Sequence, residues 1–240
     1  MRLVLIGLVA GFFSALFGVG GGLVIVPLLL LVAHWEERPA MATSLAAVGV
    51  TALAGTILYA LHGKVEPSYA ALVGLPAAVG VVAGAALQQR IRRRGLSLLF
   101  SLLVLVVAIE LFFSPPRLSE SFALAVLLGF AAGILAGLFG VGGGGILFVP
   151  TLLALGLTQL HAEATSLMAI LPTAAVGTWR QSRYGNVRWR SAALLGVSSI
   201  GGAEGGILVA THLPEDLLRR LFAVFMLCVA AQLAWRERRP

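Results

Sequence analysis

The chain has 240 residues, of which 59% are hydrophobic and 11% are charged, and its mean hydropathy is +0.99. Soluble domains carry about a quarter charged residues, so this composition excludes a water-soluble globular protein and predicts an integral membrane protein with several spans. The net charge of +7 comes from arginines in short connections between apolar runs, which indicates membrane topology rather than nucleic-acid binding.

The first apolar run, 3–33, is interrupted in its middle by glycines at positions 18, 20, 21 and 22. Each glycine costs about 1 kcal/mol relative to alanine in a helix, but glycine adopts positive φ readily. We therefore expect two short helices that meet at a glycine turn. The remaining apolar runs lie at 40–61, 68–88, 97–113, 120–157, 164–180, 190–211 and 216–235.

The chain is an internal duplication. Residues 7–22 reappear as residues 129–144, and the segment Ala-Thr-Ser-Leu at 42–45 reappears at 164–167. After the first match the second copy has one extra residue, Gly145, so that Pro27 meets Pro150, and the original offset resumes at Ala42. A turn-forming stretch at 114–117 separates the copies, so we predict a first membrane repeat at 1–114 and a second at 115–240, which together form one transport domain.

Arginine placement predicts that the repeats are inverted. The connections at 90–94 and 180–190 are rich in arginine and should be cytoplasmic, as should the C-terminus. Their repeat counterparts, 212–216 and 62–67, are not enriched, so equivalent connections fall on opposite sides of the membrane. The predicted fold is an all-α integral membrane protein with two inverted-topology repeats, each with a glycine-broken helix pair. Whether that pair re-enters or crosses twice stays open.

The glycine breaks predict an anion site. A helix that begins just after such a break leaves its first N–H groups unpaired, beside the positive end of the helix dipole. Hydroxyl groups at the start of the following span add donors, although they can instead cap that helix. The predicted substrate-binding residues are Gly18, Gly20, Gly21, Gly22, Thr43 and Ser44 in the first repeat, and Gly140, Gly142, Gly143, Gly144, Gly145, Thr165 and Ser166 in the second.

Other glycines are spaced four residues apart, as in 7/11, 80/84, 129/133 and 202/206, and this spacing indicates helix packing. Glu204 lies in the middle of a predicted span, where the first repeat has Val82, and it is the candidate for proton coupling or for a structural carboxyl group. The sequence has no metal-ligand spacing, no nucleophile–base pair and no Walker A motif. We therefore expect no metal, no cofactor, no catalytic residue and no enzyme activity.

The paired Phe-Gly-Val-Gly-Gly-Gly segments, the prolines Pro27 and Pro150 that follow them, and the two Ala-Thr-Ser-Leu segments resemble the sulfite exporter TauE/SafE family of membrane permeases. The resemblance covers essentially the whole chain. It implies a multi-pass permease or exporter of the bacterial cytoplasmic (inner) membrane for small sulfur-containing anions such as sulfite or organosulfonates, coupled to an ion gradient. Gly145 and Glu204 have no counterpart in the first repeat, so the two half-sites are not expected to be identical.

Two alternatives to this function stay open. One is a carrier of another small solute or of a cation, and the other is a structural membrane protein that uses its glycines for packing alone. The expected partners are a small anionic substrate and the lipid bilayer, not nucleic acid. A homo-oligomer is compatible with the sequence.

Overall fold

The computed structural model describes residues 1–91, 99, 102, 105, 122–139 and 145–237, and the regular elements in this part of the chain are helices. In chain order they are α1 (Arg2–Phe17), α2 (Gly22–Leu31), α3 (Glu37–Leu61), α4 (Pro67–Arg90), α6 (Phe122–Phe139), α7 (Gly145–Ala154), α8 (Gln159–Arg183), α9 (Trp189–His212) and α10 (Glu215–Glu237). This order is the expected duplication, because α1 to α4 correspond in sequence to α6 to α9.

The long central helices α3 and α8 end in the same way. Each is followed by a glycine in the left-handed conformation, Gly63 at φ 63° and Gly185 at φ 71°. The residue after each glycine donates its N–H to a carbonyl in the last turn, from Lys64 to Tyr59 and from Asn186 to Gln181. Glycine stops the helix here because a side chain would oppose positive φ.

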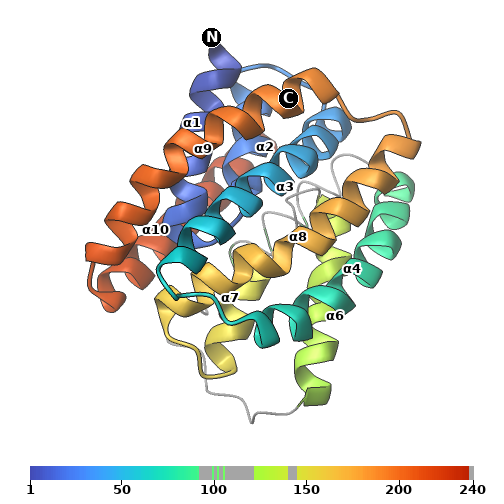
Figure 1. Ribbon diagram of the computed structural model, residues 1–240. Helices are drawn as coiled ribbons and strands as arrows, with labels where there is room; N and C mark the ends of the chain where they lie inside the picture. Colours follow the sequence, from blue (N-terminus) through green and yellow to red (C-terminus); the bar gives the residue numbers. More distant parts are fainter. Residues whose placement is uncertain (92–98, 100–101, 103–104, 106–121, 140–144, 238–240) are drawn as a thin grey trace.

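The closest helix pairs join the two halves of the chain. Helix α1 packs along α9, its counterpart α6 packs along α4, and α3 crosses α8 between these pairs. In Figure 1, α3 and α8 lie side by side but run in opposite directions, and α4 and α9 also run in opposite directions. The hydrophobic core therefore depends on contacts between the halves.

Glycines allow these helices to approach one another closely. A methyl group added at Gly84 of α4 would overlap the carbonyl oxygen of Ile134 in α6. The same addition at Gly11 of α1 would overlap the carbonyl oxygen of Ser199 in α9. Backbone lies directly on backbone at both places, which confirms the packing interpretation of the glycines spaced four residues apart.

This contact gives a first prediction, that Gly84→Ala destabilises the folded protein. The added methyl group would meet backbone, which cannot rotate away, so we expect a loss of about 1–3 kcal/mol and a lower Tm in detergent. Gly49→Ala is the matched control, since a Cβ there meets only the Ala174 Cβ, at 3.6 Å. Equal Tm values for the two variants would contradict the packing role of Gly84.

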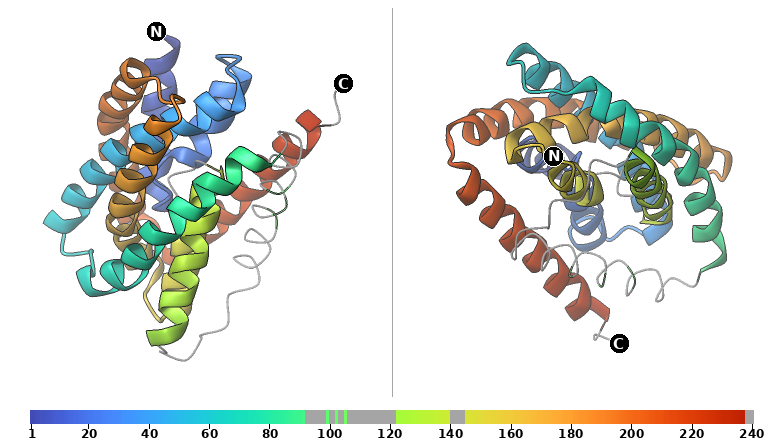
Figure 2. Two further views of the ribbon diagram at one scale, coloured as in Figure 1. Left: turned by 90° about the vertical axis from the view of Figure 1, so that its right-hand side faces the viewer. Right: turned by 90° about the horizontal axis from the view of Figure 1, so that it is seen from below.

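Helix α10 packs on α8 and α2, and its phenylalanines also stack on α1. Phe222 and Phe225 of α10 stack on Phe17 of α1, with ring centroids 5.1 and 5.4 Å apart, and Phe225 also stacks on Phe13 at 4.9 Å. Figure 2 shows α10 along one side of the molecule and α3 and α8 along the other, with α1, α2, α6 and α7 between them.

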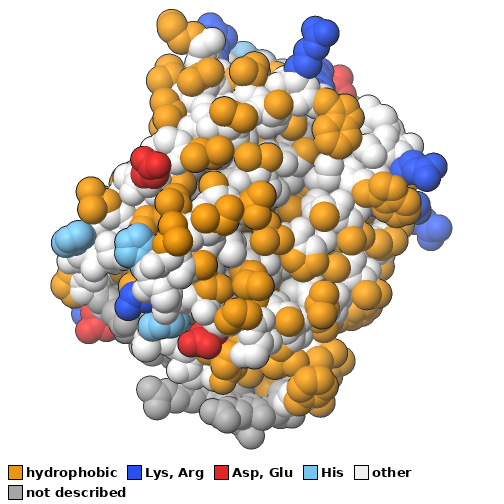
Figure 3. Space-filling model, viewed as in Figure 1, with side chains coloured by type: hydrophobic (Ala, Val, Ile, Leu, Met, Phe, Trp, Pro, Cys, Tyr) orange, Lys and Arg blue, Asp and Glu red, His pale blue; other side chains and the backbone are white. Residues whose placement is uncertain are grey.

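Four helices in the described part of the chain, α3, α4, α6 and α9, are long and apolar enough to cross a membrane. Helices α1 and α2 are apolar but shorter, and α8 is as long as α3 but carries more polar residues. Figure 3 shows hydrophobic side chains spread over the face viewed in Figure 1, with Lys and Arg gathered at its upper and right-hand edges. An apolar surface bounded by basic side chains is typical of a membrane protein.

Candidate functional site

The first glycine break forms a tight turn, residues Gly18 to Gly21, between α1 and α2, and we call it the first glycine turn. Gly18, Gly20 and Gly21 have φ values of 65°, 70° and 78°, a region that residues with a side chain rarely adopt. All of these residues are buried. The sequence-predicted substrate residues of the first break thus lie in one compact turn inside the molecule.

Three carbonyl groups at this turn are bonded to donors within the protein, whereas no donor is described for the carbonyls of Val19 and Gly20. The carbonyl of Gly21, the residue that precedes α2, accepts from the N–H groups of Val24 and Ile25 at 3.0 and 2.8 Å. The carbonyl of Gly18 accepts from the Ser166 hydroxyl at 2.5 Å. The carbonyl of Ser14 accepts from the N–H groups of Gly18 and Val19.

Several donors at the turn also have no described partner. Among the described residues, no acceptor pairs with the N–H groups of Gly20, Gly22 or Leu23. The Ser14 hydroxyl is buried and likewise has no partner in this part of the chain, and its Cβ lies 3.4 Å from the position of a Cβ on Gly21. Buried polar groups are almost always hydrogen-bonded, so this concentration of donors without a described acceptor makes the turn a candidate for an anion site.

Helix α8 of the second repeat covers the turn. A Cβ on Gly18 would lie 2.5 Å from Glu163 Cα, so the turn packs directly on the backbone of α8. Gly20 sits between the side chains of Val48 in α3 and Ile170 in α8, which are repeat counterparts of each other. The first glycine turn therefore contacts both α3 of the first repeat and α8 of the second.

The two predicted threonines make reciprocal hydrogen bonds between the halves. Thr43 Oγ1 accepts from the backbone N–H of Arg188, just before α9, and Thr165 Oγ1 accepts from that of Glu66, just before α4, both at 3.0 Å. Each threonine thus holds the start of a helix in the other repeat. A hydroxyl that accepts one hydrogen bond still has its own proton to donate.

Thr165→Val tests this structural role. Valine keeps the shape but leaves the N–H of Glu66 without its acceptor, so we expect about 1–3 kcal/mol of destabilisation, measured as a lower Tm. Thr165→Ser retains the hydroxyl and serves as the control. A valine variant with the Tm of the serine variant would show that the bond does not stabilise the fold.

The predicted serines are both buried inside α3 and α8, which begin at Glu37 and Gln159, so they do not cap these helices. Ser166 reaches Gly18 of the first turn, whereas the hydroxyl of its counterpart Ser44 has no partner among the described residues. In the second break, Gly140, Gly142, Gly143 and Gly144 lie outside the described residues, and Gly145 begins α7. The structure thus brings together the first-break glycines and Ser166 and says nothing of the second turn.

Glu204, the predicted coupling residue, is exposed on the outer face of α9. Sequence reasoning passed over another acidic residue, Glu163 of α8, which is 0% exposed and lies against the first glycine turn. Its Oε1 accepts from Gln159 Nε2 at 2.6 Å, and Tyr59 of α3 lies within electrostatic range of it. One signal in the sequence could have pointed to Glu163. It lies three residues before Ser166 in a repeated segment, where the first copy has Met41 at the equivalent position.

The groups at this turn are hydrogen-bonding groups of the backbone and of hydroxyl side chains. Within the described residues, no group of three or more His, Cys, Asp or Glu side chains is arranged to hold a metal ion. Backbone N–H groups, a helix N-terminus and hydroxyls can hold a small anion by hydrogen bonds without forming a covalent bond to it.

Comparison with known proteins finds a family and relatives that match along essentially the whole chain. The family model described as "Sulfite exporter TauE/SafE" matches residues 3–144 and 125–240. A probable membrane transporter protein of Xylella fastidiosa (strain Temecula1 / ATCC 700964) is 32% identical over 248 residues, covering 96% of this chain and 93% of that protein. The probable membrane transporter protein YdhB of Bacillus subtilis (strain 168) is 28% identical, covering 94% and 96%. No solved structure matches.

Proposed function

Because the chain belongs to the sulfite exporter TauE/SafE family of membrane transporters, we propose that it is a permease for small sulfur-containing anions such as sulfite or organosulfonates, coupled to an ion gradient. The proposed substrate site contains the first glycine turn and the start of α2. Thr43 and Ser44 of the same repeat would add donors, and the predicted glycines of the second break, with Thr165 and Ser166, would complete the site from the other repeat.

The observation that carries this proposal is the group of buried donors at the turn and at the start of α2. The N–H groups of Gly20 and Gly22 have no described acceptor. Free donors at a helix N-terminus suit an anion, which the dipole of α2 also favours. A cation would instead use the carbonyls of Val19 and Gly20, for which no donor is described, and ligand stabilisation distinguishes the two.

The expected strength of anion binding at this site also suits a carrier. Neutral N–H and O–H donors bind an anion more weakly than a buried arginine would, because hydrogen bonds from charged donors are roughly twice as strong. A substrate held by neutral donors can leave on the other side of the membrane. Irregular backbone at this depth is tolerated in transporters mainly where it lines such a cavity.

We further propose that the repeats are inverted in the bacterial inner membrane. The opposite directions of α3 and α8 support this, as do the reciprocal bonds of Thr43 and Thr165. A two-fold relation in the membrane plane would bring the second glycine turn towards the same centre from the other side.

Cysteine labelling tests the inversion at counterpart positions. In a Cys228→Ala background, a cysteine at Lys64 should react with a membrane-impermeant maleimide from the periplasmic side, and one at Asn186 should react only after permeabilisation. The expected difference follows from the arginines that flank Asn186, which keep that connection in the cytoplasm. Labelling of both positions from the same side would rule out inverted repeats.

The substrate proposal is tested by ligand stabilisation of the purified protein. We expect sulfite, thiosulfate or methanesulfonate to raise the Tm at millimolar concentration, as RT ln(1 + [L]/Kd) requires for a ligand of the folded state. Choline and sodium, tested as chloride salts, provide the cation arm. Stabilisation by cations alone would favour the cation carrier, and no stabilisation by any solute would favour a structural role.

A further inference from the structure

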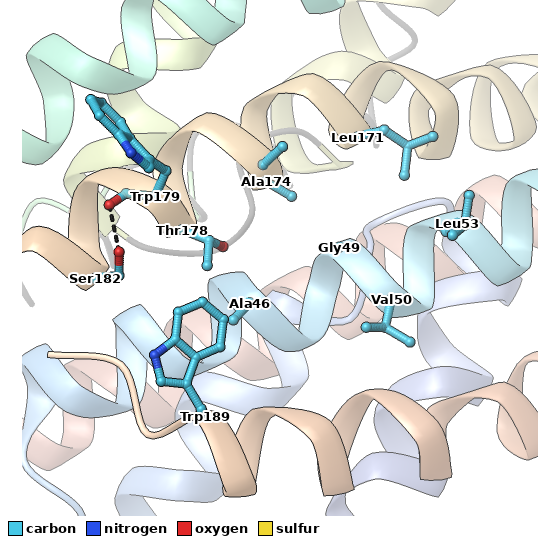
Figure 4. Close-up of a pocket in the computed structure, with 11 residues that line it drawn as sticks. Ala46, Gly49, Val50, Leu53, Leu171, Ala174, Thr178, Trp179, Ser182 and Trp189 are labelled. Carbon is cyan, nitrogen blue, oxygen red and sulfur yellow. Dashed lines mark hydrogen bonds between the residues drawn. The ribbon is translucent and has the colours of Figure 1, made fainter.

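A second feature lies on the opposite face of the α3–α8 pair from the first glycine turn. It is a groove of about 780 Å³ between α3 and α8, bordered at one end by Trp189, the first residue of α9, and we call it the α3–α8 groove (Figure 4). Its lining is apolar except for Thr178 and Ser182. Nothing in the sequence comparison or in the proposed transport site accounts for it.

The groove is open only in the half beside Ala46 and Gly49. The reason is that the two repeats carry side chains of different size at these positions. Ala46 and Gly49 of α3 form one wall, whereas their counterparts in α8 are the larger Met168 and Leu171. A Cβ on Gly49 would meet only the Ala174 Cβ, at 3.6 Å, so the space beside it is empty of protein. The duplicated transport site requires no such difference, so the groove is a separate feature of this molecule.

One end of the groove is aromatic and basic. Figure 4 shows Trp179 and Trp189 on either side of this end, and they are 52% and 60% exposed. Their repeat counterparts are Ile57 and Pro67, so the opposite end has no such pair. Exposed tryptophans at the end of an apolar surface are typical of the level of the lipid headgroups.

The charge at this end is positive. The Arg183 guanidinium lies over the Trp179 ring at 5.5 Å, Arg190 follows Trp189 directly, and Arg188 lies over Trp35 at 4.2 Å. No acidic residue occurs between Trp179 and Arg190, and the nearest acids in the adjoining start of α3 are Glu36 and Glu37. The arginines therefore outnumber the acids where the groove opens.

We propose that the α3–α8 groove binds an anionic phospholipid, with an acyl chain along the apolar wall and the phosphate near Arg183 and Arg190. An elongated apolar channel with one cationic, tryptophan-lined end matches an amphiphile with an anionic head. The arginine-rich connection is also the one that the sequence places in the cytoplasm, where bacterial and other membranes present anionic lipid to basic residues. A second copy of the chain would present mainly apolar surface and would leave the arginines without counter-charge.

The test measures lipid binding by the full-length protein in detergent. Native mass spectrometry and thermal stabilisation would compare dioleoyl phosphatidylglycerol with dioleoyl phosphatidylcholine, which share their acyl chains. We expect tighter binding of phosphatidylglycerol, and about five-fold weaker binding for each of Arg183→Gln and Arg190→Gln. Lys64→Gln, a basic residue at the other end of α3, should leave the preference unchanged.

A second pair of variants tests the groove itself. Gly49→Leu introduces the residue that the second repeat has at this position and should abolish the preferential binding of phosphatidylglycerol. Gly201→Leu is the matched control, because Gly201 is also a helical glycine whose Cβ would meet only a side chain, Leu8 Cδ2 at 3.5 Å. Equal binding of the two lipids, or a Gly49→Leu variant that binds like wild type, would overturn the proposal. A dimer that Gly49→Leu dissociates would instead make the groove a contact between copies.

Discussion

Replacing Gly21 with valine is expected to eliminate substrate binding while the protein still inserts into the membrane. Gly21 has φ 78°, a conformation that costs an ordinary L-residue roughly 1–2 kcal/mol and is worse for a β-branched one. Its new Cβ would lie 3.2 Å from the Ala10 carbonyl oxygen and 3.4 Å from Ser14 Cβ. The start of α2 would have to move, and the donors that the anion needs would move with it.

The measurements for this variant are sulfite-dependent stabilisation and transport in proteoliposomes. We expect both to fall to background, with a membrane-inserted yield within a few-fold of wild type. Gly63→Val is the control, because Gly63 has φ 63° and nothing within 4 Å of its Cβ position, so it carries the backbone strain without touching the site. Gly143→Val is expected to act like Gly21→Val if both breaks form the site. If Gly21→Val binds and transports like wild type, the substrate site lies elsewhere.

The second large effect concerns Glu163. The backbone of the buried residue Glu163 packs on the first glycine turn, and an ionised carboxylate on this residue would repel an incoming anion, so we predict that anion binding is linked to protonation of Glu163. Binding would then strengthen as the pH falls. The other titratable group shown near it is Tyr59 of α3, whereas α2 and α7 carry no charged residue.

Glu163→Gln should therefore bind methanesulfonate with an affinity that no longer depends on pH. Methanesulfonate is chosen because it stays ionised throughout the range, so that any pH response belongs to the protein. We expect the wild-type affinity to change on the order of tenfold, which corresponds to about 1.4 kcal/mol, and the variant to remain at the low-pH value.

Glu204→Gln distinguishes the two acidic residues. The sequence made Glu204 the candidate for coupling, but this side chain is exposed on α9 rather than placed at the turn. We expect the Glu204→Gln variant to keep the wild-type pH response. If Glu204→Gln removes the response and Glu163→Gln retains it, coupling belongs to Glu204 and the electrostatic argument for Glu163 fails.

The sequence alone predicted the features that are encoded locally. Composition identified a membrane protein, and the family to which the chain belongs was predicted from its paired motifs. The first apolar run is interrupted at Gly18, Gly20 and Gly21, which have positive φ. The sequence could predict this because glycine destabilises a helix and adopts positive φ through local effects that act within a few residues. The packing glycines were recognised for a similar reason, since a spacing of four places them on one face of a helix.

Only the tertiary structure decided which distant residues meet. Thr43 and Arg188 bond across the halves, and Glu163 reaches the first glycine turn, because α1 packs on α9 and α3 crosses α8. No local pattern encodes such meetings, which depend on how all the helices pack together. For the same reason, Glu204 looked buried from its place in an apolar run, but a run fixes only the depth of a residue in the membrane and not the side of the helix on which it lies.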